Sequence, residues 1–147
     1  MGYTHYWNFI IERGQTASLE KSYQRAISDC QRVVKKYYNE NGGLSGYTAH
    51  CKLGQYAGLQ VNGAGADGCE EFIMREHLTE NHADFCKTRQ NPYDIVIVAC
   101  LAILKHRLGV AMLVSSDGRP ADWESGVELA RRVTGLKIKN PIKERQQ

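Results

Sequence analysis

The longest apolar run in the chain covers residues 95–104 and lies between a polar, cationic stretch and a glycine. No polar stripe interrupts the run, which predicts a helix covered on most of its sides by other elements. Asn91 is a favourable N-cap, Pro92 suits the first helical position, and Asp94 puts negative charge in the first turn. Gly109 is expected to end the helix. The pattern therefore predicts a buried central helix over residues 91–108.

Three other stretches have a clear period. Residues 3–9 alternate and are rich in aromatic side chains, which predicts a first strand with Tyr3, His5, Trp7 and Phe9 on one face. Residues 16–39 carry apolar side chains at helical spacing with charged ones between them, as an amphipathic helix does. Residues 110–114 form an apolar run of strand length, and residues 120–135 predict a last amphipathic helix that begins at a proline and ends at a glycine.

The middle of the chain is less regular. Residues 59–62 and 69–75 are typical of two short strands joined by the glycine-rich turn 63–68. Residues 44–58 are predicted to be loop, with room for an irregular edge strand, and residues 76–90 a polar surface excursion that carries His77 and His82. The order of elements predicts an α+β fold, in which about three helices pack on a small, mostly antiparallel sheet and the central helix is buried.

Charge divides the chain into two parts. The 147 residues suit a single domain, which we place at residues 1–135. Residues 136–147 contain four cations and one carboxylate and account for the whole formal net charge of +3, so they are predicted to be a basic, flexible tail. The remaining body is formally neutral, which argues against a dedicated binder of duplex nucleic acid.

Cysteine spacing and hydropathy narrow the class further. The five cysteines form no CxxC or CxxH pair, so neither a zinc site nor a redox pair is indicated, and no metal or cofactor is expected. The opening MGYTHYW lacks an apolar run of signal-peptide length, and the central helix is too short for a comfortable membrane span. We expect a cytoplasmic protein with reduced thiols and no membrane partner.

The strongest candidate for chemistry is the cationic loop before the central helix. A helix N-terminus offers free N–H donors, and Lys87, Thr88 and Arg89 just ahead of it favour an anion or phosphate site. The carboxylate of Asp94 could instead occupy those donors and leave the two cations solvated. Cys86 could be an activated thiol, although a small buried hydrophobe is the preferred interpretation.

Two further stretches could contribute to the same site. The loop at Ser115, Ser116 and Asp117 follows a strand and precedes a helix, where loops often line a pocket, although an ordinary turn explains it too. The aromatic face of the first strand could stack on a base or could be core. The predicted ligand-binding set is Tyr3, His5, Trp7, Lys87, Thr88, Arg89, Asn91, Tyr93, Asp94, Ser115, Ser116 and Asp117, with no catalytic and no metal-binding residue.

Three separated motifs carry a resemblance to a known group of proteins. The opening MGYTHYW, the segment FCKT followed by PYD, and SSDG followed by Trp123 resemble small proteins encoded by tailed bacteriophages and prophages. The resemblance implies a setting and no particular activity. Accessory phage proteins of this size commonly block host defence, and several families sequester the cyclic nucleotides made by bacterial immune systems.

These observations lead to one expected function and two alternatives. We expect an accessory phage protein that binds a small anionic ligand, of nucleotide or cyclic-nucleotide type, without catalysis. Lys87 and Arg89 would hold the phosphate. The first alternative is a nucleotide phosphodiesterase or hydrolase that uses His5, His77 or His82 with an aspartate, although His77 and Thr79 form only one copy of the two-histidine phosphoesterase motif. The second is an inhibitor of a host protein through surface contacts, and homo-oligomerisation is left open.

Overall fold

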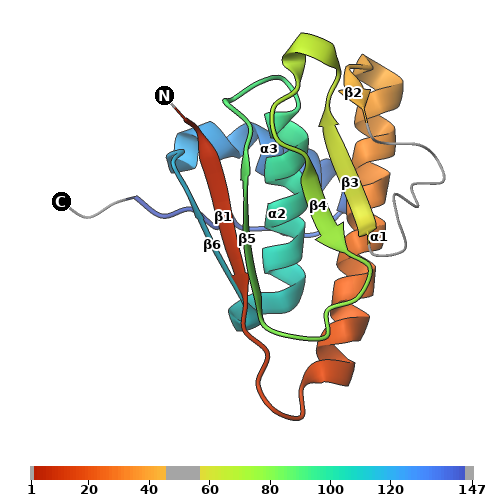
Figure 1. Cartoon of the computed structure of the whole chain (residues 1–147), viewed down its shortest axis with the longest axis vertical. Helices are drawn as coiled ribbons and strands as arrows, with labels where there is room; N and C mark the ends of the chain where they lie inside the picture. Colours follow the sequence, from red (N-terminus) through yellow and green to blue (C-terminus); the bar gives the residue numbers. More distant parts are fainter. Residues whose placement is uncertain (1, 46–56, 145–147) are drawn as a thin grey trace.

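The computed structural model describes residues 2–45 and 57–144, which form a layer of strands backed by helices (Figure 1). Two short 3-10 turns, Gly65–Asp67 and Gly109–Ala111, complete the regular structure. The helices and strands in chain order are β1 (Thr4–Phe9), α1 (Thr16–Asn41), β2 (Leu44–Ser45), β3 (Ala57–Gly63), β4 (Phe72–Arg75), β5 (His82–Lys87), α2 (Asp94–Leu108), β6 (Met112–Ser116) and α3 (Pro120–Thr134). The predicted α+β class is confirmed.

The strands form two antiparallel sheets of three strands each instead of the single sheet expected. Their orders are β5-β1-β6 and β2-β3-β4. At one end β5 meets the start of β4, where Glu70 N donates to Lys87 O at 3.0 Å, while residues 76–81 separate the two strands at the other end. The predicted hairpin of β3 and β4 is confirmed.

Residues 76–90 were expected to be a surface excursion, and for residues 82–87 this prediction is wrong because they form β5. β5 pairs with β1 along its whole length, from Thr4 opposite Lys87 to Phe9 opposite His82. Only Cys86 in β5 is fully buried, so the strand lacks the apolar alternation that marks a half-buried strand in a sequence. Its pairing with β1 is what makes it a strand.

The faces of β1 are as predicted. His5, Trp7 and Phe9 are buried, while Tyr6 on the opposite face is 43% exposed. β1 is the central strand of its sheet, and α2 and α3 lie behind that sheet (Figure 1).

The central helix is buried on nearly all sides, as predicted, but it begins three residues later than expected. Asn91 does not cap it, because its side-chain amide donates to Gly68 O at 3.2 Å and Tyr93 occupies the N-cap position. Arg89 and Gln90 both have positive φ, at 56° and 55°, so the chain turns before the helix starts. A 3-10 turn after α2 likewise moves β6 two residues beyond the predicted strand.

The C-terminal segment packs on the domain beyond the boundary placed at residue 135. Ile138 is buried, and its carbonyl oxygen accepts from Arg131 Nε at 2.8 Å. Asn140 Nδ2 donates to Pro120 O at 2.8 Å, and Ile142 packs against the core. The described part of the predicted flexible tail is therefore held by the fold through residue 142. No described helix is both long and apolar enough to cross a membrane.

Candidate functional site

The three stretches expected to form a site meet at one end of the β5-β1-β6 sheet. β1 lies between the other two strands, with Thr4 opposite Lys87 and His5 opposite Ser116. Just beyond the strand ends, Thr88 N donates to Tyr3 O and Asp117 N donates to Thr4 O, each at 3.0 Å. The cationic loop, the first strand and the SSDG loop therefore converge. Only those of their side chains that reach solvent can contact a ligand.

A buried chain of hydrogen bonds joins these stretches. The His5 ring is fully buried, with Nε2 at 2.6 Å from Asp94 Oδ1 and Nδ1 at 2.7 Å from Ser116 Oγ. Thr88 Oγ1 donates to the same oxygen of Asp94. Because a carboxylate only accepts, we assign the proton of a neutral His5 ring to Nε2, which leaves Nδ1 to accept the Ser116 hydroxyl proton.

The Ser116 hydroxyl oxygen has no capacity left for a further partner. It accepts from Gly118 N at 2.9 Å and from Trp123 Nε1 at 3.1 Å, in addition to its contact with His5. A hydroxyl has one proton to donate and two lone pairs, and three contacts use all of them. The order serine, histidine and carboxylate matches an acyl-transfer triad, but a nucleophile needs a free lone pair. The arrangement therefore ties β1 and β6 to α2 and α3.

The remaining aromatic candidates are also inside the fold. Trp7 is 3% exposed and packs on Phe72, with ring centroids 5.3 Å apart. The Tyr93 hydroxyl donates to Glu70 O at 2.7 Å, and burial raises the pKa of Tyr93. The Tyr3 hydroxyl is buried beside the Ser116 and Gln90 side chains without reaching hydrogen-bond geometry with a described group. Burial, and after it the charge of Asp94, raises the pKa of Tyr3 to about 12.

The predicted cations lie at the margin of this buried cluster. Arg89 is exposed on the left-handed turn before α2. The Lys87 side chain lies over Gly2, where an added Cβ would come 3.0 Å from Lys87 Cε. Asp117 is held by the sheet end, since its Oδ2 accepts from Thr4 N at 3.0 Å. None of these three residues lines the open groove beside β6.

An open groove of about 920 Å³ lies on the other side of Ser116. One wall is β6 and the start of α3, and the other is the C-terminal segment; the lining residues are Lys105, 113–116, 118–120 and 141–144. Lys105, Arg119 and Lys143 line it, and Glu144 is the one carboxylate among the described lining residues. Ser115 and Ser116 were predicted and the three cations were not, although the charge concentrated after residue 136 was a signal for Lys143.

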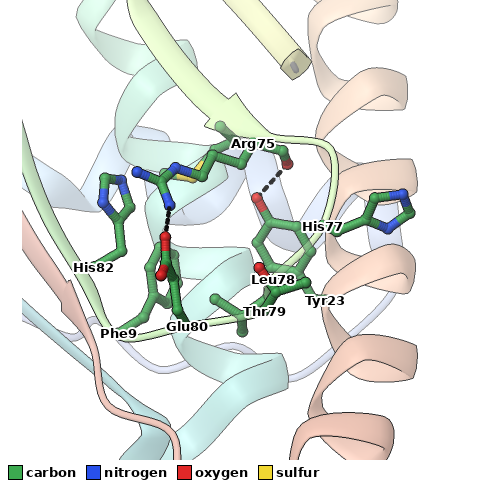
Figure 2. Close-up of a pocket in the computed structure, with 9 residues that line it drawn as sticks. Phe9, Tyr23, Arg75, His77, Leu78, Thr79, Glu80 and His82 are labelled. Carbon is green, nitrogen blue, oxygen red and sulfur yellow. Dashed lines mark hydrogen bonds and ion pairs between the residues drawn. The ribbon is translucent and has the colours of Figure 1, made fainter. Parts of the chain in front are cut away.

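A second hollow, between β1, α1 and the loop after β4, is much smaller (Figure 2). Its volume of about 10 Å³ has room for about one water. Its own groups close it: Arg75 pairs with Glu80 at 3.0 Å, and the Tyr23 hydroxyl donates to Arg75 O at 2.5 Å. Burial, assisted by the Arg75 charge, lowers the pKa of His82 at its edge.

Metal-binding groups do not gather in the part of the chain that the structure describes, where no three His, Cys, Asp or Glu side chains are placed to share an ion. Comparisons with protein-family models, with curated proteins and with solved structures find no match for this chain.

Proposed function

We propose that this chain is an accessory protein of a tailed phage or prophage that captures an anionic ligand in the groove beside β6 and releases it unchanged. The observation that carries the proposal is the lining of the groove: its volume is about 920 Å³, and its described lining residues include Lys105, Arg119 and Lys143 but only one carboxylate, Glu144. Several cations around a concave surface raise the local concentration of anions. The phage setting comes from the resemblance of the sequence motifs.

Arg119 and Lys143 are the cations available for direct contact. The Arg119 side chain is 79% exposed and its Nε pairs with Asp122 Oδ2 at the long distance of 4.0 Å, so its exposed guanidinium can present two N–H groups to a phosphate or carboxylate. The Lys105 ammonium donates to Gly109 O at 2.9 Å and Met112 O at 2.7 Å and contributes mainly charge. A cyclic nucleotide that serves as an immune signal is one small molecule that would fit these groups. Its phosphate would lie beside Ser115.

Titration calorimetry with a panel of cyclic nucleotides and nucleoside triphosphates tests this form of the proposal. Binding should weaken with added salt. The affinity should fall at least about tenfold in the Arg119→Glu variant, because a carboxylate that repels phosphate replaces the guanidinium that binds it. Arg25→Glu, on the exposed face of α1, makes the same change in net charge away from the groove and should bind normally. Equal weakening by both variants would show that net charge, and not the groove, holds the ligand.

The fate of the ligand separates capture from turnover. A capture protein returns the nucleotide intact when it is denatured after incubation, and chromatography of the released material measures this directly. Chemical change of the nucleotide by the purified protein would overturn the non-catalytic part of the proposal.

A hydrolase is the second candidate, and the chain from Ser116 through His5 to Asp94 is the observation that favours it. For this reaction Ser116 Oγ would have to give up its contact with Gly118 N or with Trp123 Nε1 to free a lone pair for attack. A hydrolase should convert a nucleotide or an activated ester, and Ser116→Ala should abolish the conversion. Intact substrate after incubation with and without divalent metal would remove this candidate.

A further inference from the structure

β6 is an edge strand. The strand order places it at the side of its sheet, where β1 is its only strand partner among the described residues. A strand edge carries unpaired backbone N–H and C=O groups unless side chains or loops cover them. Which residues of β6 carry these groups follows from the register.

The register assigns each residue of β6 to one side. Ile10 N donates to Ala111 O at 2.8 Å, and Asp117 N donates to Thr4 O at 3.0 Å. In an antiparallel ladder every second residue bonds to the partner strand, so Leu113 and Ser115 also face β1. The backbone groups of Met112, Val114 and Ser116 therefore point away from β1.

One of these outward groups is already covered and the others are not. Lys105 Nζ donates to Met112 O at 2.7 Å, which confirms its outward direction. No described group bonds to the backbone N–H or C=O of Val114 or Ser116 on that side. The groove runs along this edge, since residues 113–116 form one of its walls. Two donors and two acceptors thus face the groove.

The far edge of β5 shows what a protected edge looks like in the same sheet. Its outward residues include Phe85 and Lys87, by the same alternation. Phe85 N donates to Asp84 Oδ1 at 2.8 Å, and Lys87 N donates to Glu70 Oε2 at 2.7 Å. Carboxylates occupy these donors of β5, whereas the edge of β6 opens into a groove bordered by cations.

From this edge and its charge we infer that the groove receives an extended acidic peptide segment of a partner protein, which pairs with β6 as an added strand. The inference rests on the proposed function, because it uses the same groove and cations, and it assigns the ligand class as peptide instead of nucleotide. Val114 and Ser116 supply the backbone bonds, and Arg119 and Lys143 select acidic side chains. A second copy is disfavoured as the occupant, because pairing β6 with β6 would bring the two sets of cations together.

Fluorescence anisotropy with a labelled peptide of about eight alternating Glu and Val residues, a usual strand length, tests the inference. The protein should bind this peptide at least about tenfold more tightly than a peptide with Lys in place of Glu. Methylating alternate backbone nitrogens of the acidic peptide keeps its charge and removes donors on one edge only. Two such peptides can be made, one methylated on the odd-numbered nitrogens and one on the even-numbered nitrogens. One of them should lose binding and the other should keep it, because a single edge of the peptide faces β6.

Amide hydrogen exchange by NMR gives an independent measurement on the protein. In the free protein the amides of Val114 and Ser116 should exchange faster than those of Leu113 and Ser115, and the acidic peptide should slow the first pair selectively. Val114→Pro removes one outward donor without touching a bond to β1 and should weaken binding of the peptide. If this variant does not fold, hydrogen exchange in the wild-type protein still tests whether the peptide pairs with β6.

The outcomes separate this inference from the proposed function. Equal binding of both methylated peptides, or unchanged exchange at Val114 and Ser116, overturns strand addition. If nucleotides bind in an Arg119-dependent way while the peptide does not, anionic capture stands and the peptide assignment is wrong. If Arg119→Glu alters the binding of neither nucleotides nor peptide, both are wrong.

Discussion

Ser116 lies between two regions with opposite properties. On its inner side, His5, Thr88 and Asp94 form a buried chain in which each side chain bonds to another. On its outer side, no described group pairs with the outward backbone groups of Val114 and Ser116, which lie along an open groove bordered by cations. The inner region is richer in residues that enzymes use, yet its hydrogen bonds are satisfied. Unmet hydrogen-bonding capacity, rather than residue type, marks the surface where a ligand can bind.

The largest effect should come from breaking the inner region. His5→Ala leaves the buried Asp94 carboxylate with Thr88 as its remaining side-chain partner and opens a hole beside Trp123. We expect the free energy of unfolding to fall by about 3 kcal/mol, the scale for removing one partner of a buried polar pair. Urea denaturation measures this.

His106→Ala is the matched control, because it removes an exposed histidine from the end of α2 and should change the free energy of unfolding by less than about 0.5 kcal/mol. Similar losses in both variants would contradict a structural role for the His5 chain. Ligand binding in the groove should persist in folded His5→Ala protein, since His5 does not line it.

A smaller loss should follow from Ser116→Ala, which belongs to both regions. The change leaves Trp123 Nε1, Gly118 N and one ring nitrogen of His5 without their partner, at a cost of about 2 kcal/mol in unfolding free energy. Ser115→Ala on the opposite, exposed face of β6 serves as the control for thermal or urea unfolding. A Ser116→Ala protein as stable as the wild type would show that the hydroxyl is not structurally required.

Elements whose apolar side chains recur at a regular spacing could be predicted from the sequence. β5, which is a strand because it pairs with β1, could not. α2, α3 and β1 each have an apolar pattern, whereas β5 mixes polar and apolar residues on both faces. Among the candidate residues, His5 and Asp94 are 89 positions apart and His5 and Ser116 are 111 apart. Their residue types indicated chemistry, but only the fold shows that they satisfy one another.

The groove was beyond sequence reasoning for a related reason. A free strand edge depends on strand order and register, which fix the direction of the backbone groups of Val114 and Ser116. The sequence pattern assigned no role to Arg119, and it placed Lys143 in a segment predicted to be flexible. Folding of the C-terminal segment over β6 brings these two cations to one surface.

A substitution in the outer region should change ligand affinity without changing the stability of the fold. Arg119→Glu should change the free energy of unfolding by less than about 0.5 kcal/mol, because the side chain is 79% exposed. The same variant should lose at least about tenfold in affinity for an anionic ligand. Urea denaturation and calorimetry on one preparation test both parts. A large loss of stability would mean that Arg119 is structural and would remove the contrast between the two regions.

The smallest expected effect uses a second histidine–carboxylate pair to show what burial adds. His77 Nδ1 lies 2.7 Å from Glu20 Oε1, close to the 2.6 Å of His5 and Asp94, but His77 is exposed at the surface beside α1. The hydrogen bond from His77 to Glu20 raises the pKa of His77, and burial opposes this only in part. The stability from this pair is therefore fully present below the unfolded pKa of about 6.5 and is lost as the pH rises through the higher folded value.

NMR titration of the His77 ring should show this raised pKa, and Glu20→Gln should move it back toward the ordinary value because the acceptor loses its charge. Screening by salt should reduce the shift, as expected for an exposed pair. A His77 pKa that ignores both changes would contradict the Glu20 contact. His77 and Glu20 should titrate as expected, whereas His5→Ala should destabilise the fold. Similar geometry at the two histidine–carboxylate pairs would then have different consequences, because only the pair of His5 and Asp94 is excluded from water.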